Sequence, residues 1–197
     1  DRLIRDRQPK LYQHVLELRS KAAVQQALAL GSGKPRLHIS SKFGAGYANG
    51  SLILPIAQNP QNKNEVICVD LRYSPQPLFD CDVETLARLM YTKVDELPAG
   101  TDRIPLKSVH LNRCPIVLST GLLDDQVIER LQLDVDQCEQ HRKQLLANDD
   151  LVPKLISVYQ QKRFENVDTD VDAMLYEGFF SPQDRTSMQA IPSLDGA

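Results

Sequence analysis

The densest group of reactive side chains in the sequence lies in the stretch KSVHLNRCP, residues 107–115. It combines a lysine, a histidine, an asparagine, an arginine and a cysteine. Such a mixture could form a nucleophilic pair, a metal site, a nucleic-acid contact, or a strand that runs into a turn. In a strand, the Cα atoms of His110 and Cys114 would be about 13 Å apart, at ~3.3 Å per residue. This distance excludes a Cys–His pair or a shared metal unless the chain folds back between the two residues.

The rest of the chain carries no complete catalytic or metal-binding pattern. GxGxxG, phosphate-loop, GxSxG and HExxH motifs are absent, and the four cysteines are scattered without a C-x-x-C pair. Three aspartates within 168–172 begin like a calcium loop but lack the glycine and the closing glutamate at the required offsets. His14, His38 and His141 have no second ligand at metal spacing, so we expect structural roles for them. The cysteines are interpreted as reduced thiols of a cytoplasmic protein.

Composition and charge are those of a soluble globular protein, but the charge is distributed unevenly along the chain. Of the 197 residues, 42% are hydrophobic and 25% are charged, and no apolar run approaches the ~20 residues of a membrane span. The net charge of −3 is divided into +6 over residues 1–50, −1 over 51–120 and −8 over 121–197. This division permits a phosphate-binding face in the N-terminal part only. A solvated basic helix explains the same charges more simply.

Alternating apolar residues and turn-forming connectors predict a meander of short strands. Its first three strands are separated by connectors rich in Gly, Asn or Pro, and two more strands follow, broken at Cys114–Pro115. This order predicts a small antiparallel barrel or a strongly curved sheet. The expected strands are 36–40, 51–57, 65–71, 104–112 and 115–119.

Helical periodicity flanks these strands, so the expected fold class is α+β. The first helical pattern runs to Leu16 and is kinked or restarted at Pro9. A second begins after Asp82, which we predict to be its N-cap. Three short helices are predicted after residue 124, and the polar, aperiodic segment 162–172 is interpreted as a linker.

Within the strand predicted at 104–112, alternation separates two kinds of side chain. Val109 and Leu111 share one face, with Lys107 and Arg113 at the ends of that apolar face, where long side chains reach past it to water. The other face is polar and could contact a ligand or be the solvated side of a sheet; it carries Ser108, His110 and Asn112. Together with Asn62–Asn64 and Tyr91–Thr92, these residues have the composition of a single-stranded nucleic-acid groove, although composition alone is not specific.

Six segments, taken together and in order, resemble bacterial exodeoxyribonuclease I, a processive 3′-to-5′ exonuclease of single-stranded DNA. The similarity extends over roughly residues 1 to 188. The segments are RQPKLY (7–12), KPRLHISSKFGA (34–45), NPQNKNEVICVDL (59–71), MYT (90–92), KSVHLNRCP (107–115) and VDAMLYEGFFSPQD (171–184).

The resemblance implies a piece of a larger enzyme. A nuclease domain of the DEDD type, a Src-homology-3-like barrel domain with added helices, and a helical domain would follow one another. Residues 1–20 would end the nuclease domain, 21–161 would form the small antiparallel barrel with flanking helices, and 162–197 would be a linker and the start of the helical domain. The magnesium ions would belong to the missing nuclease domain, so no cofactor and no nuclease activity are expected of this chain. A monomer in the cytoplasm, without membrane attachment, is also expected.

In this family the middle domain helps to hold the DNA strand and so supports processivity. Lysines and arginine would neutralise phosphates, asparagines would bond phosphate or sugar oxygens, and Tyr91 would stack or bond a phosphate. Phe43 has a simpler alternative role as filler of the barrel end. The positions carried over as DNA-binding are Lys21, Lys42, Phe43, Asn64, Tyr91, Lys107, Asn112 and Arg113.

The family also binds the acidic, hydrophobic C-terminal tail of single-stranded-DNA-binding protein. Lys34 matches one basic position of that site. Four other positions depart from the aromatic, amide or basic residues expected there: His14, Ser119, Asp124 and Leu146. The primary hypothesis is therefore a domain that guides single-stranded DNA, and the alternatives are a protein-docking module for that tail and a purely structural spacer.

Overall fold

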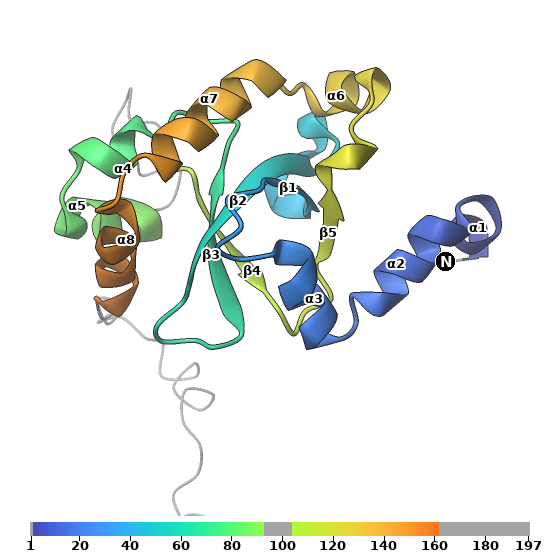
Figure 1. Ribbon diagram of the computed structural model, residues 1–197, viewed down its shortest axis with the longest axis horizontal. Helices are drawn as coiled ribbons and strands as arrows, with labels where there is room; N and C mark the ends of the chain where they lie inside the picture. The colour runs from blue at the N-terminus through green and yellow to red at the C-terminus, as the bar shows by residue number, and fades with distance from the viewer. Residues whose placement is uncertain (1, 93–103, 162–197) are drawn as a thin grey trace, which may run out of the picture. The chain divides into compact units, whose positions relative to one another are not determined.

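The computed structural model describes residues 2–92 and 104–161, and in them an antiparallel sheet is flanked by helices (Figure 1). The strand pattern predicted from alternation is confirmed, with bounds that differ by a few residues. The strands are β1 (Arg36–Ile39), β2 (Gly50–Gln58), β3 (Glu65–Asp70), β4 (Leu106–His110) and β5 (Ile116–Ser119).

The strands are hydrogen-bonded in the order β4-β3-β2-β1-β5, and every neighbouring pair is antiparallel. At the centre, Leu37 of β1 lies opposite Leu52 of β2 and Leu118 of β5. The register between β2 and β3 shifts between Pro55 and Ala57, as expected where a proline removes one ladder donor.

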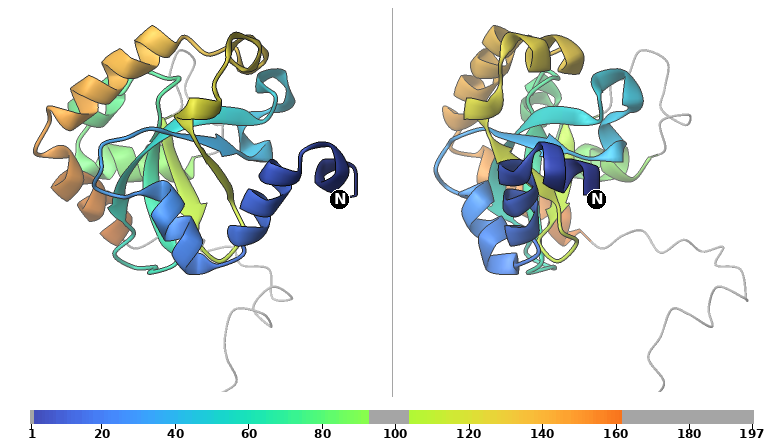
Figure 2. Two further views of the ribbon diagram at one scale, coloured as in Figure 1. Left: turned by 45° about the vertical axis from the view of Figure 1, so that its right-hand side comes forward. Right: turned by 90° about the vertical axis from the view of Figure 1, so that its right-hand side faces the viewer.

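The closed barrel anticipated above is not found in the described residues, where β4 and β5 are the two unpaired edges of an open sheet. The two strands are joined by a short turn and diverge from it (Figure 2). Cys114 in this turn has a left-handed φ of 47°, and Pro115 has no N–H to donate to a ladder. The chain therefore leaves β4 and pairs with β1, and the β5 edge contacts helix α2 instead: Nε2 of His14 donates to the Val117 carbonyl at 3.0 Å.

One face of the sheet is covered by a layer of helices that bury the larger apolar cluster. Leu54 and Val69 from the sheet meet Leu86 and Leu155 from this layer, and all four side chains are fully buried. Such burial supplies the main favourable term in folding. The layer consists of α4 (Gln76–Asp80), α5 (Val83–Tyr91), α6 (Asp125–Leu131), α7 (Val135–Leu146) and α8 (Leu151–Gln160). The short 3-10 turn η4 (Thr120–Leu122) lies between β5 and α6.

The opposite face is covered by α3 (Lys21–Leu28) and by the 3-10 turn η1 (Ser41–Phe43). Val24 and Leu28 of α3 pack with Val109 of β4 in a second apolar cluster, because alternate residues of each strand point to opposite faces. The other elements on the N-terminal side are α1 (Arg2–Arg7), α2 (Pro9–Glu17) and the 3-10 turn η2 (Ala45–Tyr47).

Several helix boundaries follow from local chemistry. The predicted interruption at Pro9 is confirmed, since α1 ends at Arg7 and Pro9 opens α2. Asp82 caps α5 as predicted, accepting a hydrogen bond from the Thr85 N–H at 2.7 Å. The separate helices α3 and α4 were not predicted, because each is too short to show a clear period.

Arg72 joins the end of β3 to three other elements. Its guanidinium donates to the carbonyls of Leu131, Gln132 and Gly50 at 2.8–2.9 Å. The same group lies 4.0 Å from the centre of the Tyr47 ring. One side chain therefore links β3, the start of β2, η2 and the end of α6.

In the part of the chain that the structure describes, no helix combines the length and the apolar character needed to cross a bilayer. The predicted linker 162–172 and the segment from 173 to 197 lie outside the described residues.

Candidate nucleic-acid interface

Apart from Tyr91, the predicted DNA-binding residues fall into two groups on the side of the sheet covered by α3. In the first group, the Nζ of Lys21, at the start of α3, donates to Oδ1 of Asn64 at 2.6 Å. Asn64 ends the β2–β3 turn, and its carbonyl accepts the Leu111 N–H at 2.7 Å. Asn112 and Arg113 follow Leu111 in the next turn and are exposed. Four residues from three separate segments are therefore gathered at one end of the sheet.

The second group lies around η1. The Nζ of Lys107, on β4, is 5.2 Å from the centre of the Phe43 ring, within the range of a cation–π contact. Phe43 itself is buried, with 8% of its surface exposed, so its ring is chiefly a packing surface. The neighbouring Lys42 is exposed. This geometry fits the simpler role considered for Phe43, that of filling the core beneath η1.

Beneath Phe43 lies a buried polar cluster that the sequence analysis did not identify. His38 meets the Phe43 ring edge-on, with ring centres 5.6 Å apart, and its Nδ1–H donates to the Ile116 carbonyl at 2.8 Å. Nearby, the Ser51 hydroxyl donates to Oδ1 of Asp70 at 2.5 Å. The sequence did contain a signal for this cluster. His38, Ser51 and Asp70 each occupy a position on an otherwise apolar strand where alternation places the side chain on the inner face.

Burial shifts the acid–base behaviour of this cluster. It raises the pKa of Asp70, against the opposing effects of the Ser51 hydroxyl, the Arg72 N–H and the charges of Lys107 and Arg72. Burial also lowers the pKa of His38, against the bond to the Ile116 carbonyl, and the charges of Lys42 and Lys107 lower it further. Burial therefore shifts the pKa of each group in the direction that disfavours its charged form.

The lowered pKa of His38 predicts a loss of stability in mild acid. Because the folded state binds this proton less tightly than the unfolded chain, the contribution of His38 is present above its ordinary pKa of 6.5 and is lost as the pH falls below it. We expect the free energy of unfolding to decrease between about pH 7 and about pH 5. In His38→Asn, which retains an N–H donor, the decrease should be smaller. Denaturant titrations at each pH measure this, with His110→Asn as control; equal pH dependence in wild type and His38→Asn would contradict it.

The prediction for the polar face of β4 is wrong at Ser108, and the prediction for the Tyr91 side chain lies outside the described residues. The polar face of β4 is neither a ligand surface nor a solvated face at Ser108, because the Ser108 hydroxyl lies 3.3 Å from the phenol oxygen of Tyr159 on α8. At Ser108, α8 of the helical layer covers that face. Tyr91 is the last residue of α5, and its side chain lies outside the described part of the structure.

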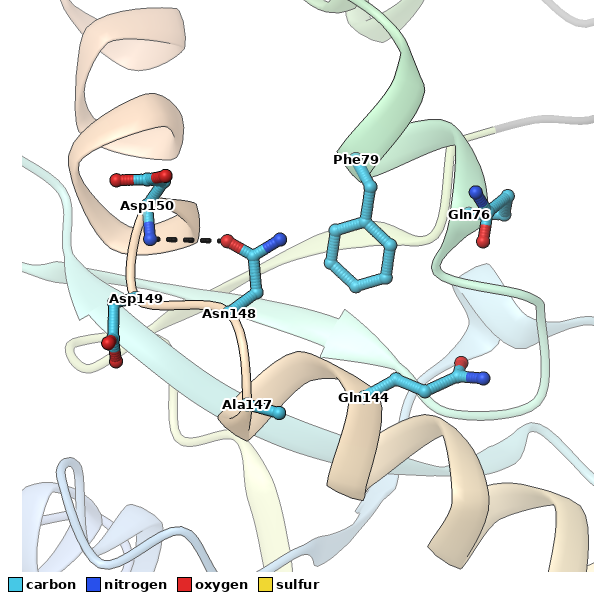
Figure 3. A pocket seen from close by; sticks show the side chains of 7 residues that line it. All are labelled: Gln76, Phe79, Gln144, Ala147, Asn148, Asp149 and Asp150. Atoms are coloured by element: carbon cyan, nitrogen blue, oxygen red, sulfur yellow. Dashed lines mark hydrogen bonds between the residues drawn. The ribbon is translucent and has the colours of Figure 1, made fainter.

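A hollow of about 540 Å³ lies away from both groups, between α4 and the α7–α8 turn (Figure 3). The Phe79 ring faces it across from Asn148, whose Oδ1 accepts the Asp150 N–H at 3.1 Å. The two adjacent carboxylates would repel phosphate, so this hollow does not suit nucleic acid. Its lining residues are Gln76, Phe79, Gln144, Ala147, Asn148, Asp149 and Asp150.

Within residues 2–92 and 104–161, no group of three or more His, Cys, Asp or Glu side chains is arranged to hold a metal ion. The arrangement offers lysine, arginine and amide groups beside a buried ring, which suits contact with a phosphate backbone.

The family model described as the Exonuclease I SH3-like domain matches residues 19–161 of the chain. The chain belongs to this family. Exodeoxyribonuclease I of Escherichia coli K12 is 32% identical over 190 residues, which cover 96% of this chain and 40% of that protein. The Haemophilus influenzae protein of the same name is 32% identical over 194 residues, covering 98% of this chain and 41% of that protein. The chain thus spans about two fifths of the length of these curated relatives.

Solved structures of exonuclease I agree with this assignment. That of Methylocaldum szegediense, described as moderately thermophilic, superposes with a TM-score of 0.79 at 36% identity, covering 95% of this chain and 39% of that one. The E. coli enzyme in complex with a 5cy-dT13 oligonucleotide superposes with a TM-score of 0.82 at 32% identity, covering 99% of this chain and 43% of that one.

Proposed function

We propose that this chain guides single-stranded DNA as the middle domain of an exodeoxyribonuclease I, a 3′-to-5′ exonuclease acting in DNA repair and recombination. The observation that carries the proposal is the gathering of Lys21, Asn64, Asn112 and Arg113 at one end of the sheet, on the side that also bears Lys107. The E. coli relative solved with a 5cy-dT13 oligonucleotide supports it. Guiding the strand is the proposed contribution to processivity.

Each side chain has a role that matches its chemistry. Lys21, Lys42, Lys107 and Arg113 neutralise phosphates, which is the dominant, salt-dependent term in nucleic-acid affinity. The amides of Asn64 and Asn112 bond phosphate or sugar oxygens. Tyr91 stacks on a base or bonds a phosphate. Phe43 contributes by supporting Lys107 from below.

Catalysis is assigned to another part of the parent enzyme. Magnesium and its acidic ligands belong, in this proposal, to a nuclease domain of the DEDD type that precedes this segment. The chain itself needs no cofactor. We place the parent enzyme in the cytoplasm as a monomer.

Fluorescence anisotropy with a labelled oligothymidylate tests the guiding function. The 197-residue chain should bind the oligonucleotide, and the affinity should rise as monovalent salt is lowered from about 200 mM to about 50 mM, because counterion release drives the association. Binding that is absent at the lower salt concentration would contradict DNA guidance by this chain and favour a structural spacer.

In the full-length enzyme, Tyr91→Ala and Lys107→Ala are expected to shorten the runs on long single-stranded substrates. Degradation of short oligonucleotides should be spared, because the proposed contacts lie away from the reacting phosphate. Run lengths measured with a trap of unlabelled DNA check this, and unchanged run lengths would overturn both assignments.

A second candidate function is docking of the acidic, hydrophobic C-terminal tail of single-stranded-DNA-binding protein. One observation favours it: a hollow of about 200 Å³ lies next to Lys34 in the chain, bounded by Pro35, Leu123, Val135 and Cys138 among others. Such a hollow suits a terminal apolar side chain, with Lys34 for the carboxylates.

Three of the positions that depart from the family's tail site have structural contacts here. His14 bonds the β5 edge, the Asp124 carboxylate caps α6 by accepting the Val127 N–H at 2.8 Å, and Leu146 packs 3.2 Å from where a Cβ on Gly33 would lie. The contacts of all three side chains lie within the fold.

The tail hypothesis predicts binding of an acidic peptide that ends in an apolar residue. Lys34→Ala should weaken it by about 3- to 10-fold, the range for loss of one partly exposed charge-assisted hydrogen bond. Affinity for oligothymidylate should not change, and Lys63→Ala, at the far end of the sheet, is the control. Peptide binding that is absent, or equal in both variants, would contradict this function.

A further inference from the structure

The pair of Ser51 and Asp70 buries a carboxyl group inside the sheet. Ser51 is fully buried and Asp70 is 1% exposed. Oδ1 of Asp70 accepts the Ser51 hydroxyl and the Arg72 N–H, at 2.5 Å and 3.1 Å. Oδ2 has no hydrogen-bond partner among the described residues. A carboxylate oxygen buried in this way is expensive, so a nearby cation is needed to offset it.

The Arg72 side chain does not fill this position, because its guanidinium is bonded to the three carbonyls of Leu131, Gln132 and Gly50. The other cation whose charge acts on Asp70 is Lys107. Cys68 lies opposite Lys107 in the β3–β4 ladder, and Asp70 is two residues further along β3. Alternation therefore places Asp70 and Lys107 on the same face, as diagonal neighbours.

Lys107 is also in contact with a ring that is itself fixed. Its Nζ lies 5.2 Å from the centre of the Phe43 ring. That ring rests edge-on against His38, which is bonded to the Ile116 carbonyl. The Lys107 ammonium thus lies near the Phe43 ring, on the same face of the sheet as the buried Asp70 side chain, whose pKa its charge lowers.

We propose that the Ser51–Asp70 pair is a positioning site for Lys107, and that the buried carboxylate and the Phe43 ring together hold the ammonium ready for a DNA phosphate. This inference rests on the proposed function and adds residues that do not themselves touch the strand. A free lysine side chain loses rotamer entropy when it binds, and fixing it beforehand removes part of that cost.

The first test is independent of DNA. In the proton NMR spectrum of the 197-residue chain, the ε-methylene protons of Lys107 should be shifted upfield by the Phe43 ring. Asp70→Asn keeps an acceptor for Ser51 and Arg72 but removes the charge, so the shift should move toward the value of an unstructured lysine. Ser51→Ala, a milder change, should move it part of the way.

The second test is a double-mutant cycle on oligothymidylate affinity, with Asp70→Asn, Lys107→Met and the double variant. Asp70→Asn should weaken binding by about threefold, in the range of coupling between neighbouring residues. In the Lys107→Met background, Asp70→Asn should cause no further loss of affinity, because the ammonium that Asp70 positions is absent. A merely structural effect of Asp70 would persist in that background.

The outcomes separate the two proposals. An upfield shift that is absent in wild type, or unchanged in both Asp70→Asn and Ser51→Ala, overturns the positioning role. Tighter DNA binding by Asp70→Asn, or an equal loss in both backgrounds, also overturns it, since the carboxylate would then be screening Lys107 or stabilising the fold. A shift that responds as expected in a chain that does not bind DNA supports the positioning of Lys107 and overturns the guiding function.

Discussion

Replacing both Lys21 and Lys107 with methionine is expected to weaken oligothymidylate binding by roughly 50-fold at about 50 mM salt. Each phosphate contact on a single strand contributes about 0.7 to the slope of log affinity against log salt concentration. The two substitutions should therefore reduce that slope by about 1.4. The expected effect is large because the two residues lie in different groups of the candidate interface, where we propose that they contact different phosphates.

The measurement is anisotropy over a series of salt concentrations, supported by thermal unfolding to show that both variants fold. Methionine retains the length and apolar stem of lysine, which matters for the contact between Lys107 and Phe43. Lys143→Met provides a matched control, because Lys143 is exposed on α7 over the opposite face of the sheet. An equal loss of affinity in the control would show that net charge, not position, determines binding.

Arg72→Met is expected to lower the free energy of unfolding by about 2–4 kcal/mol. The substitution removes three hydrogen bonds to carbonyls at 2.8–2.9 Å and the contact with Tyr47. The bonds to Leu131 and Gly50 are partly buried, so those two carbonyls would lose their partner without full access to water. No other described side chain joins β2, β3 and α6 in this way.

For a domain of this size the predicted change corresponds to a fall in Tm of about 5–15 °C. Calorimetry or thermal circular dichroism measures it. Arg88→Met is the control, since Arg88 is exposed on α5, and its Tm should change by about 2 °C or less. A similar Tm for wild type and Arg72→Met would show that solvent satisfies those carbonyls equally well.

Much of the sheet and helix layer could be predicted because these elements depend on local sequence patterns. Strand alternation, Gly- and Asn-rich connectors and the N-cap at Asp82 each depend on residues close together in the chain. The resemblance to exodeoxyribonuclease I also came from the sequence, and the match of the family model to residues 19–161 confirms the family. The short helices α3 and α4 were missed, because a segment of one or two turns shows no reliable period.

The barrel was not confirmed, because closure depends on how two strands from one turn separate in space. A left-handed Cys114 followed by Pro115 directs β5 to the β1 edge, and no local pattern shows which edge it will take. The polar face of β4 was also misjudged at Ser108. Alternation correctly separated the two faces, but only packing shows that α8 covers one of them.

The sequence by itself determined the residue types of the proposed DNA-binding surface and the faces on which alternation placed them. Only the tertiary structure decided which of them meet. Lys21 and Asn64 are distant in the chain but lie 2.6 Å apart, because α3 crosses the end of the sheet at the β2–β3 turn. His38, Ser51 and Asp70 come from three strands and form one buried cluster under Phe43. Such contacts join residues far apart in sequence, and they form only when apolar burial brings the strands and helices together.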